Sequence, residues 1–470
     1  MYRVYSMIDH NPMPGWLRRS LRILTRTILI LNFIALIFKR IAVAAISPVE
    51  AGRMTAAVNI QSSIDFRPTS PNFHVLSATA SLHWFPRNSS HQRASGFKLS
   101  QSKYKSNEPH LTSLLHNDND VNAMQIYWEQ PGDFAQCQLQ ATVQTQSDVT
   151  PVRNKIPFPL SHHNIPSNVQ IYLLPQDIAN TSPQIQSIAT SITSDTDDLY
   201  HAVYNIAEWV HNNIQYKFTS SQKPQSATSV LRSKRGKCDE LTALFVSMVR
   251  SVGIPARFIS GYAYNENIQV FEQRWMGHSW AQVYFPGVGW VPFDVTDRQY
   301  GYVDAGHVML CVSLDAYQED IEYVAHGIDF EPKTDDLNVV VEPKSIISKS
   351  CRDIDIGLNV QAKEVGFGSA AVVVVTVKNN RDCYISAQVD VVRPREIKAL
   401  NLDESSRIHV LLNPREVKEF SLFFIMDDKQ GYQSGYSYEY PFSISSPSST
   451  TTKTASIIAR EGGPMFYAKM

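Results

Sequence analysis

The spacing of apolar residues changes twice along the 470-residue chain. Apolar and polar side chains alternate in the first part, and this period of two predicts half-buried strands at 123–130 and 136–146. In the middle, apolar residues recur every three or four positions, which predicts one helix over 197–217 and a second that begins near Cys238. Alternation then returns at 256–264, 278–285, 289–295 and over much of 345–445. The order predicts an α+β protein with a helical segment between β-rich regions.

Turns, proline breaks and composition divide this pattern into five segments. A chain of this length has room for two to four domains with their own cores. We expect polar loops over 86–120 and a Ser/Thr-rich flexible tail at the end. The predicted segments are a basic and apolar stretch at 1–51, an N-terminal β-rich domain at 52–160, a central core at 161–328, a β-sandwich at 345–445 and the tail at 446–470.

Five basic residues precede the apolar run 27–38. Twelve residues are short for a membrane span of about 20, but they suit the core of a signal peptide with the cleavage motif Ala-Val-Ala at 42–44. Extension back to Leu21 gives an Arg-interrupted membrane anchor instead, and a buried helix of a soluble protein is the remaining alternative. Because the positive flank stays in the cytoplasm, we expect a membrane-anchored or secreted protein whose remainder lies outside.

Charge and cysteine content limit the classes of partner and cofactor that we expect. The 43 Lys and Arg nearly balance the 44 Asp and Glu, so there is no electrostatic reason to expect nucleic acid. The five cysteines form no zinc-ligand spacing, and we predict no metal and no cofactor. A calcium site at Asp294 and Asp297 is the alternative. Cys351 and Cys383 can pair as a disulfide in an exported protein or remain two buried thiols.

Cys238 lies where the second helix is expected to begin. A helix N-terminus favours negative charge, and so do the neighbouring cations of Arg235 and Lys237, so a thiolate suits this position. The alternative is a buried structural thiol. Downstream, His278 opens one strand and Asp294 ends the next, on either side of a turn at 286–289. An antiparallel hairpin places these two side chains opposite or diagonal, within reach of a hydrogen bond. Only the tertiary fold can bring Cys238 to them.

These residues carry a family pattern. The chain has Gly236-Lys-Cys238 at a helix start, Gly-Ile-Pro-Ala-Arg at 253–257, Gly-Tyr at 261–262, His278-Ser-Trp280, and Gly-Trp at 289–290 ahead of Asp294-Val-Thr. This stretch resembles the transglutaminase-like superfamily of papain-type cysteine enzymes. The one departure is Val295, where the family has proline, and it removes no catalytic group.

The resemblance implies a papain-like core, in which a helix bearing Cys238 packs on an antiparallel sheet. The alternation over 345–445, which the motifs do not cover, predicts the Ig-like β-sandwich after it. It implies a catalytic triad of Cys238, His278 and Asp294 that cleaves or transfers acyl groups of a protein or peptide substrate. The Cys238 backbone N–H is the first candidate oxyanion donor, and Gln215 and Tyr216 are candidates for the second. Candidate pocket walls are Trp280, Trp290 and Tyr262. Protein crosslinking, and non-catalytic binding of a surface peptide, glycan or cell-wall component, are the alternatives to hydrolysis.

Overall fold

The computed structural model describes residues 46–100, 110–117, 120–218, 223–266, 273–316, 319–349, 353–402, 406–426, 435–449 and 451–466. Within these ranges no helix is long and apolar enough to cross a membrane. The apolar run at 27–38 and Cys351 lie outside the described residues. The signal or anchor expectation therefore stays a prediction, and Cys383 is a free, buried thiol.

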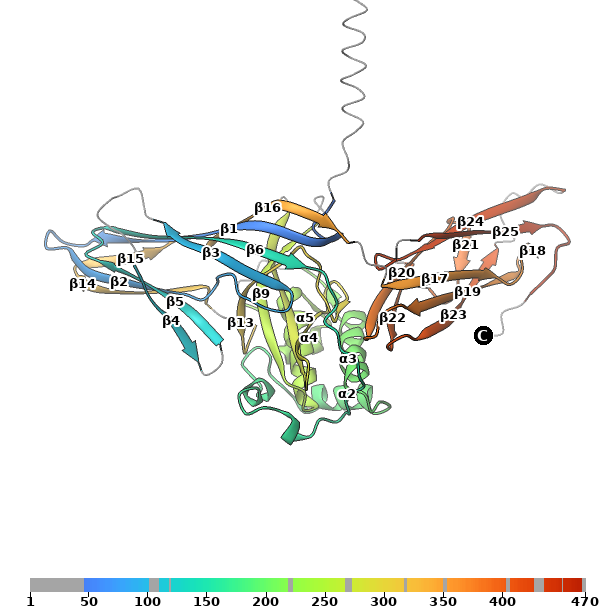
Figure 1. Ribbon diagram of the computed structural model, residues 1–470, viewed down its shortest axis with the longest axis horizontal. Helices are drawn as coiled ribbons and strands as arrows, with labels where there is room; N and C mark the ends of the chain where they lie inside the picture. The colour runs from blue at the N-terminus through green and yellow to red at the C-terminus, as the bar shows by residue number, and fades with distance from the viewer. Residues whose placement is uncertain are drawn as a thin grey trace, which may run out of the picture. The chain divides into compact units, whose positions relative to one another are not determined.

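The N-terminal β region consists of two antiparallel sheets around one apolar core (Figure 1). One sheet has the order β15-β1-β6-β3, with β16 also on β1, and the other has the order β14-β2-β5-β4. Its strands are β1 (Ala51–Pro68), β2 (His74–Leu82), β3 (Gln92–Ser100), β4 (His110–Asn117), β5 (Asp120–Glu129), β6 (Phe134–Gln146), β14 (Ile321–Ile328), β15 (Phe330–Thr334) and β16 (Asn338–Ser348).

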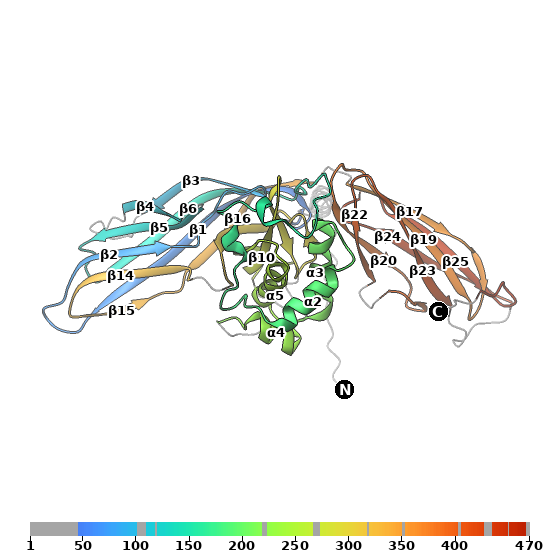
Figure 2. The same cartoon turned by 90° about the horizontal axis from the view of Figure 1, so that it is seen from below.

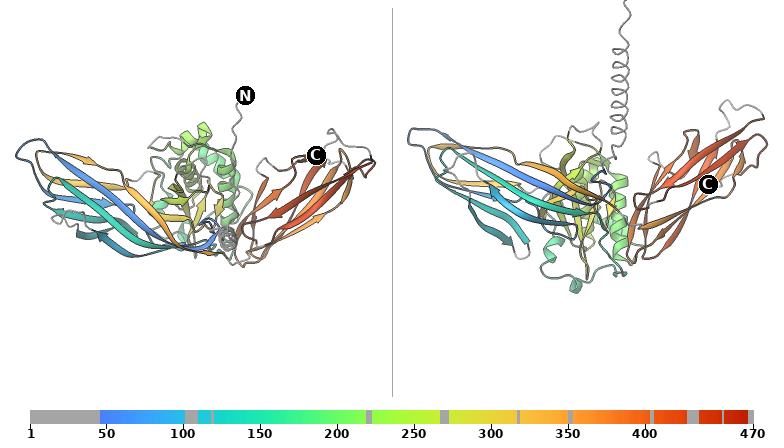
Figure 3. Two further views of the ribbon diagram at one scale, coloured as in Figure 1. Left: turned by 90° about the horizontal axis from the view of Figure 1, so that it is seen from above. Right: turned by 45° about the horizontal axis from the view of Figure 1, so that its top comes forward.

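Two boundaries predicted for this region are wrong. The expected domain at 52–160 is completed by three strands that follow the core in sequence: β16 and β15 pair with β1, and β14 pairs with β2. Figure 3 shows these yellow and orange strands beside the blue strands. The core expected at 161–328 therefore ends before β14. The loops expected over 86–120 contain β3 and β4, because polar side chains also suit strands exposed on one face.

The central region packs helices against a five-stranded sheet of order β12-β11-β10-β9-β13. Its strands are β9 (Ala256–Tyr264), β10 (Trp275–Phe285), β11 (Gly289–Asp294), β12 (Gln299–Tyr300) and β13 (His307–Ser313). Its helices are the short η1 (His162–Asn164) and η2 (Gln170–Leu173), and α2 (Pro183–Thr193), α3 (Leu199–Asn213), α4 (Ala227–Ser233) and α5 (Cys238–Ser251). A separate two-stranded ladder pairs β7 (Gln215–Tyr216) with β8 (Arg235–Gly236).

Helix α5 is surrounded on all sides. Every residue from Glu240 to Arg250 is buried, and the helix contacts α2, α3 and α4 as well as β9 and β10 (Figure 2). The predicted start of this helix at Cys238 and the predicted strand 256–264 agree with the structure. The expected helix 197–217 is shorter at both ends. The Asp198 carboxylate caps the start of α3 by accepting the Tyr200 backbone N–H at 2.8 Å. After Asn213 the chain forms β7 instead, which pairs with β8.

The C-terminal region is a sandwich of two sheets, β17-β19-β23-β21 and β18-β25-β24-β20-β22, with a shared apolar core. Its strands are β17 (Ile354–Val360), β18 (Glu364–Gly366), β19 (Ala370–Asn379), β20 (Ile385–Val392), β21 (Ile397–Ala399), β22 (Arg407–Leu412), β23 (Val417–Met426), β24 (Ser437–Ser445) and β25 (Lys453–Arg460). The flexible tail expected at 446–470 is wrong, since β25 pairs with both β24 and β18. The Ig-like type of the sandwich stays a prediction.

Candidate active site

Cys238 is the first residue of α5, and the chain before it is held in place by a buried carboxylate. Glu240 is 1% exposed and accepts the backbone N–H groups of Lys237 at 3.0 Å and Gln225 at 2.8 Å. A side chain at Gly236 would press on Glu240, because its Cβ would lie 2.9 Å from the Glu240 Cβ. The Lys237 ammonium, expected to favour a thiolate, instead pairs with the Asp239 carboxylate at 3.2 Å. The helix N-terminus remains the feature that favours negative charge at Cys238.

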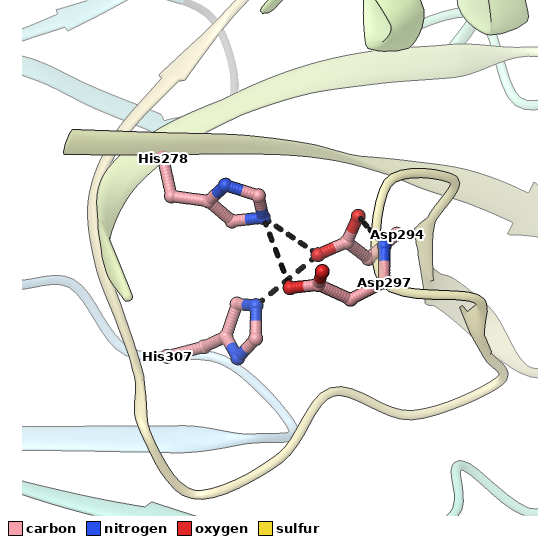
Figure 4. Close-up of side chains that lie close together, drawn as sticks. All are labelled: His278, Asp294, Asp297 and His307. Atoms are coloured by element: carbon pink, nitrogen blue, oxygen red, sulfur yellow. Dashed lines mark hydrogen bonds and ion pairs between the residues drawn. The ribbon is translucent and has the colours of Figure 1, made fainter. Parts of the chain in front are cut away.

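The hairpin of β10 and β11 joins His278 to Asp294, as its local geometry predicts. Ala281 pairs with Phe293, so Asp294 lies opposite Trp280 and diagonal to His278. The Nε2–H of His278 donates to Asp294 Oδ2 at 2.6 Å (Figure 4). The Asp294 side chain is fully buried. Its other oxygen, Oδ1, accepts the backbone N–H groups of Thr296 at 2.8 Å and Asp297 at 3.2 Å.

The packing of α5 on β10 brings Cys238 to this pair. One turn along α5, the Thr242 hydroxyl donates to the Ser279 carbonyl at 3.1 Å, and Ser279 is the neighbour of His278. Burial of the His278 ring disfavours its charge. The Asp294 carboxylate and a hydrogen bond with Cys238 outweigh that effect and raise the pKa of His278 well above its ordinary value. The arrangement therefore favours a protonated imidazole between a carboxylate and a sulfur atom.

A second histidine, His307, also binds Asp294 and was missed in the sequence. It is 1% exposed, and its Nε2 lies 3.2 Å from Asp294 Oδ2 (Figure 4). Its Nδ1 lies 3.0 Å from Asp304 Oδ1. Although burial lowers it, these carboxylates raise the pKa of His307 to about 9. The available signal was the apolar run after each histidine, since both His278 and His307 are followed directly by buried strand residues.

Strand β9 lies between β10 and β13 and has small residues where the two histidines approach each other. His278 pairs with Gly261, and His307 pairs with Ala263, two positions away on the same face. A Cβ at Gly261 would lie 2.0 Å from the Val308 carbonyl oxygen, so only glycine allows β13 this close. The histidine rings are consequently 5.3 Å apart between centroids.

Asp297 brings another carboxylate to the site. Its Oδ2 lies 4.0 Å from His278 Nε2. Loss of hydration and the charge of Asp294 raise the pKa of Asp297 to about 6. Its side chain is 52% exposed, so the repulsion by Asp294 is the stronger of these two effects.

His278, Asp294, Asp297 and His307 are also the described residues that most resemble a metal site. One ligand atom from each lies within 4.8 Å of the others. Two ligands on one tetrahedral zinc ion are about 3.3 Å apart. The 2.6 Å between His278 and Asp294 is instead the separation of a hydrogen bond with a proton between the atoms. A metal ion would have to displace that proton, so the geometry fits a chain of hydrogen bonds better than a metal centre.

Of the three expected pocket walls, the structure brings Trp280 to the triad. Trp280 is buried and stacks on the His278 ring at 6.1 Å. Trp290 lies under the Arg257 guanidinium at 4.4 Å, and it packs against Tyr172 and Tyr284 rather than the histidines. Tyr262 pairs with Gly277, not with His278, and meets Trp84 edge to face.

The expected oxyanion candidates Gln215 and Tyr216 lie in β7, beside the segment that leads to Cys238. Tyr216 pairs with Gly236, and Gln215 pairs with Arg235. Loss of hydration and the proximity of Cys238 raise the pKa of Tyr216, so its hydroxyl keeps its proton and can donate. A hollow of about 360 Å³ beside them is lined by His211, Asn212, Asn213, Ile214, Gln215, Tyr216, Lys234, Leu241 and Thr296.

Comparison with known proteins agrees with this geometry. Residues 186–295, which include Cys238, His278 and Asp294, match the transglutaminase-like superfamily. Uncharacterized protein YebA of Bacillus subtilis is 30% identical over 127 residues, which are 24% of this chain and 17% of YebA. Uncharacterized protein ML0607 of Mycobacterium leprae is 28% identical over 143 residues, 30% of this chain and 49% of ML0607. The chain thus spans less than half of either relative.

Two solved structures are similar to parts of this chain. A putative cysteine protease from Cytophaga hutchinsonii has 18% identity and a TM-score of 0.45, over 63% of this chain and 94% of that one. The periplasmic domain of TgpA from Pseudomonas aeruginosa has 13% identity and a TM-score of 0.26, over 53% of this chain and 91% of that one. The region 186–295 belongs to the transglutaminase-like superfamily, as its motifs predict.

Proposed function

We propose that the central region is a cysteine-dependent amide hydrolase that acts on proteins or peptides. The observation that carries the proposal is the His278 ring, which is hydrogen-bonded to the buried Asp294 carboxylate and to Cys238 at the start of α5. This arrangement places a nucleophile, a proton carrier and an orienting carboxylate in one line.

The chemistry takes two steps. The Cys238 thiolate attacks the carbonyl carbon of the amide, and the resulting tetrahedral intermediate loses the amine, which takes its proton from the His278 imidazolium. Water then gives a proton to the neutral His278, attacks the thioester carbon, and releases the carboxylic acid and Cys238. Asp294 keeps the Nε2–H of His278 pointed at itself throughout, which leaves Nδ1 for the sulfur and the substrate.

The oxyanion of each intermediate needs hydrogen-bond donors. The Cys238 backbone N–H is the first proposed donor, because the first N–H groups of a helix have no partner within the helix. The Tyr216 hydroxyl is the second, since it keeps its proton and interacts with Cys238. A Tyr216→Phe variant should lower kcat by about 10-fold or more and leave KM nearly unchanged. An unchanged kcat would remove Tyr216 from this role.

One incubation separates hydrolysis from the alternatives. The purified protein is mixed with a peptide library and a fluorescent primary amine, and the products are read by mass spectrometry. Hydrolysis adds water to each cleaved product, whereas crosslinking attaches the amine. We expect cleaved peptides with wild type and none with Cys238→Ala. Labelled peptides would support a transglutaminase, and unchanged peptides with both proteins would contradict the enzymatic proposal.

We also propose that the enzyme acts outside the cytoplasm, which rests on the basic and apolar pattern of residues 1–45. Residues 1–51 fused to a reporter enzyme that is active only after export should give reporter activity. Replacement of the apolar run 27–38 by polar residues should abolish it. Equal reporter activity of both fusions would contradict export by this segment.

A further inference from the structure

We propose that His307 is a positioning residue of the active site, which holds the Asp294 carboxylate against His278 and is itself held by the N-terminal β region. This inference rests on the proposed cysteine-dependent reaction. Its foundation is the chain of hydrogen bonds from Asp304 through His307 and Asp294 to His278. Figure 4 shows the part of this chain from His307 to His278.

The buried Asp294 carboxylate is fixed on both oxygen atoms. Oδ1 accepts two backbone N–H groups, from Thr296 and Asp297. Oδ2 accepts from His278 at 2.6 Å and from His307 at 3.2 Å. With both oxygens engaged, the carboxylate cannot turn away from His278. If His307 is lost, Oδ2 keeps a single partner, and a buried anion loses one of the charges that balance it.

Charge alternates along this chain of side chains. Asp304 and Asp294 flank His307, so a protonated His307 is paired on both sides. The other titratable groups that face it are His278, with its ring 5.3 Å away, and His91; the carboxylates of Asp297 and Asp304 influence the same cluster. Burial lowers the pKa of His91 to about 4, so His91 is neutral near pH 7 and does not repel His307.

The N-terminal β region fixes the backbone on both sides of His307. His91, which precedes β3, has its Nε2 3.0 Å from the His307 carbonyl oxygen. Gln92 makes two bonds to Met309: its Nε2 donates to the carbonyl at 2.8 Å, and its Oε1 accepts the N–H at 2.8 Å. The Thr145 hydroxyl of β6 donates to the Ala305 carbonyl at 2.5 Å. Residues from two strands or their ends thus set the position of the segment that bears His307.

Two substitutions of His307 distinguish a role in positioning Asp294 from a role in packing alone. Gln places an amide N–H where Nε2 of histidine lies, so His307→Gln keeps the donor to Asp294 and loses the charge. His307→Leu keeps a comparable volume and loses both. We expect kcat to fall by about 10- to 100-fold in His307→Leu, with little change in KM, and to recover to within about fivefold in His307→Gln.

The pH profile gives a readout that a space-filling role does not move. Loss of a cation beside the Asp294–His278–Cys238 chain makes the sulfur–imidazole pair of Cys238 and His278 hold its protons more tightly. Both limbs of the kcat/KM profile of His307→Gln should therefore move upward by about 0.5 to 1 unit. The matched control is His201→Leu. His201 lies on α3, and its Nε2 is hydrogen-bonded to Asn413 of the sandwich at 2.8 Å. The pH profile of this variant should equal that of wild type.

The rate of Cys238 alkylation by iodoacetamide, measured against pH, tests the inference without any substrate. Its profile should shift in His307→Gln as the kcat/KM profile does, so this test still holds if no peptide is cleaved and the proposed hydrolysis fails. His307 is not a positioning residue if neither profile shifts while circular dichroism shows a folded protein. The same conclusion follows if His307→Leu and His307→Gln lose equal activity.

Discussion

The two β regions that flank the core contact it in different ways. The N-terminal region bonds the segment that bears His307, through His91, Gln92 and Thr145. The C-terminal sandwich bonds the start of α3 instead: the Tyr384 hydroxyl donates to the Asp198 carboxylate, and the Tyr384 ring stacks on Tyr200 at 4.8 Å. One flank therefore supports the side chains of the proposed reaction, whereas the other supports α3, which carries none of the proposed catalytic residues.

The order of the strands along the sequence agrees with this difference between the two β regions. The N-terminal region is completed by β14, β15 and β16, which follow the core, so both ends of the core sequence enter the same pair of sheets. The sandwich is made entirely from residues after Asp353. We infer that the N-terminal region and the core form one functional unit, to which the sandwich adds stability.

The largest effect is expected at Asp294, where the contacts of His278 and His307 meet. Asp294→Asn removes the negative charge that both histidines share, so the imidazolium and its orientation are lost together. We expect kcat/KM to fall by about 10³- to 10⁴-fold. Steady-state kinetics on a cleaved peptide measures it. A decrease below about tenfold would show that the carboxylate does not organise the site.

The next prediction compares one variant in the N-terminal β region with one in the C-terminal sandwich. Gln92→Leu leaves the Met309 N–H and carbonyl without their side-chain partner, so we expect kcat to fall by about three- to tenfold. Tyr384→Phe removes one bond to a carboxylate, so the free energy of unfolding should fall by about 1 to 3 kcal/mol with kcat unchanged. Steady-state kinetics gives kcat, and denaturant unfolding gives the free energy of unfolding, for both variants. Equal losses of kcat in the two variants would contradict the division of roles.

The sequence predicts the local parts of this account and misses the non-local ones. His278 and Asp294 are joined by a short hairpin, so the turn and the alternation suffice to pair them. His307 reaches Asp294 only because β13 pairs with β9 across Gly261, and nothing in the spacing of residues gives that pairing. The same limit explains β16, whose Val341 pairs with the distant Val58.

The prediction of a flexible tail at 446–470, where the structure has β25, is wrong for a different reason. Serine and threonine dominate 445–452 and conceal the apolar alternation that follows it. Ile457 and Ala459 are fully buried in the sandwich core. They belong to a strand whose first and last residues are polar. Composition alone therefore gave the wrong structure, whereas partner strands elsewhere in the chain determine it.

The stability of the protein should depend on pH through His307. Its pKa is about 9 in the fold, against the ordinary value of 6.5 in the unfolded chain, so its stabilising contribution is full below about pH 6.5 and is lost as the pH rises through 9. The shift corresponds to about 3 kcal/mol. Unfolding of wild type and His307→Gln between these pH values measures it. An identical decline in both proteins would show that His307 does not titrate in this range.

The smallest effect is expected at Asp297, and its direction is opposite to that of His307. Asp297→Asn removes an anion 4.0 Å from His278 Nε2, so the imidazolium is less favoured. The alkaline limb of the kcat/KM profile should move downward by a few tenths of a unit, since the half-exposed carboxylate is screened by water. An upward shift would mean that Asp297 does not act on His278 through its charge.

The most direct test of the account is the acyl group on Cys238. Turnover of a cleaved peptide is stopped rapidly with acid, and the intact protein is weighed by mass spectrometry and then mapped. We predict wild type with the mass of the acyl fragment added, located on Cys238, and Cys238→Ala with no added mass. Turnover by wild type with no acyl group on Cys238, or undiminished turnover by Cys238→Ala, would contradict the proposed thioester mechanism.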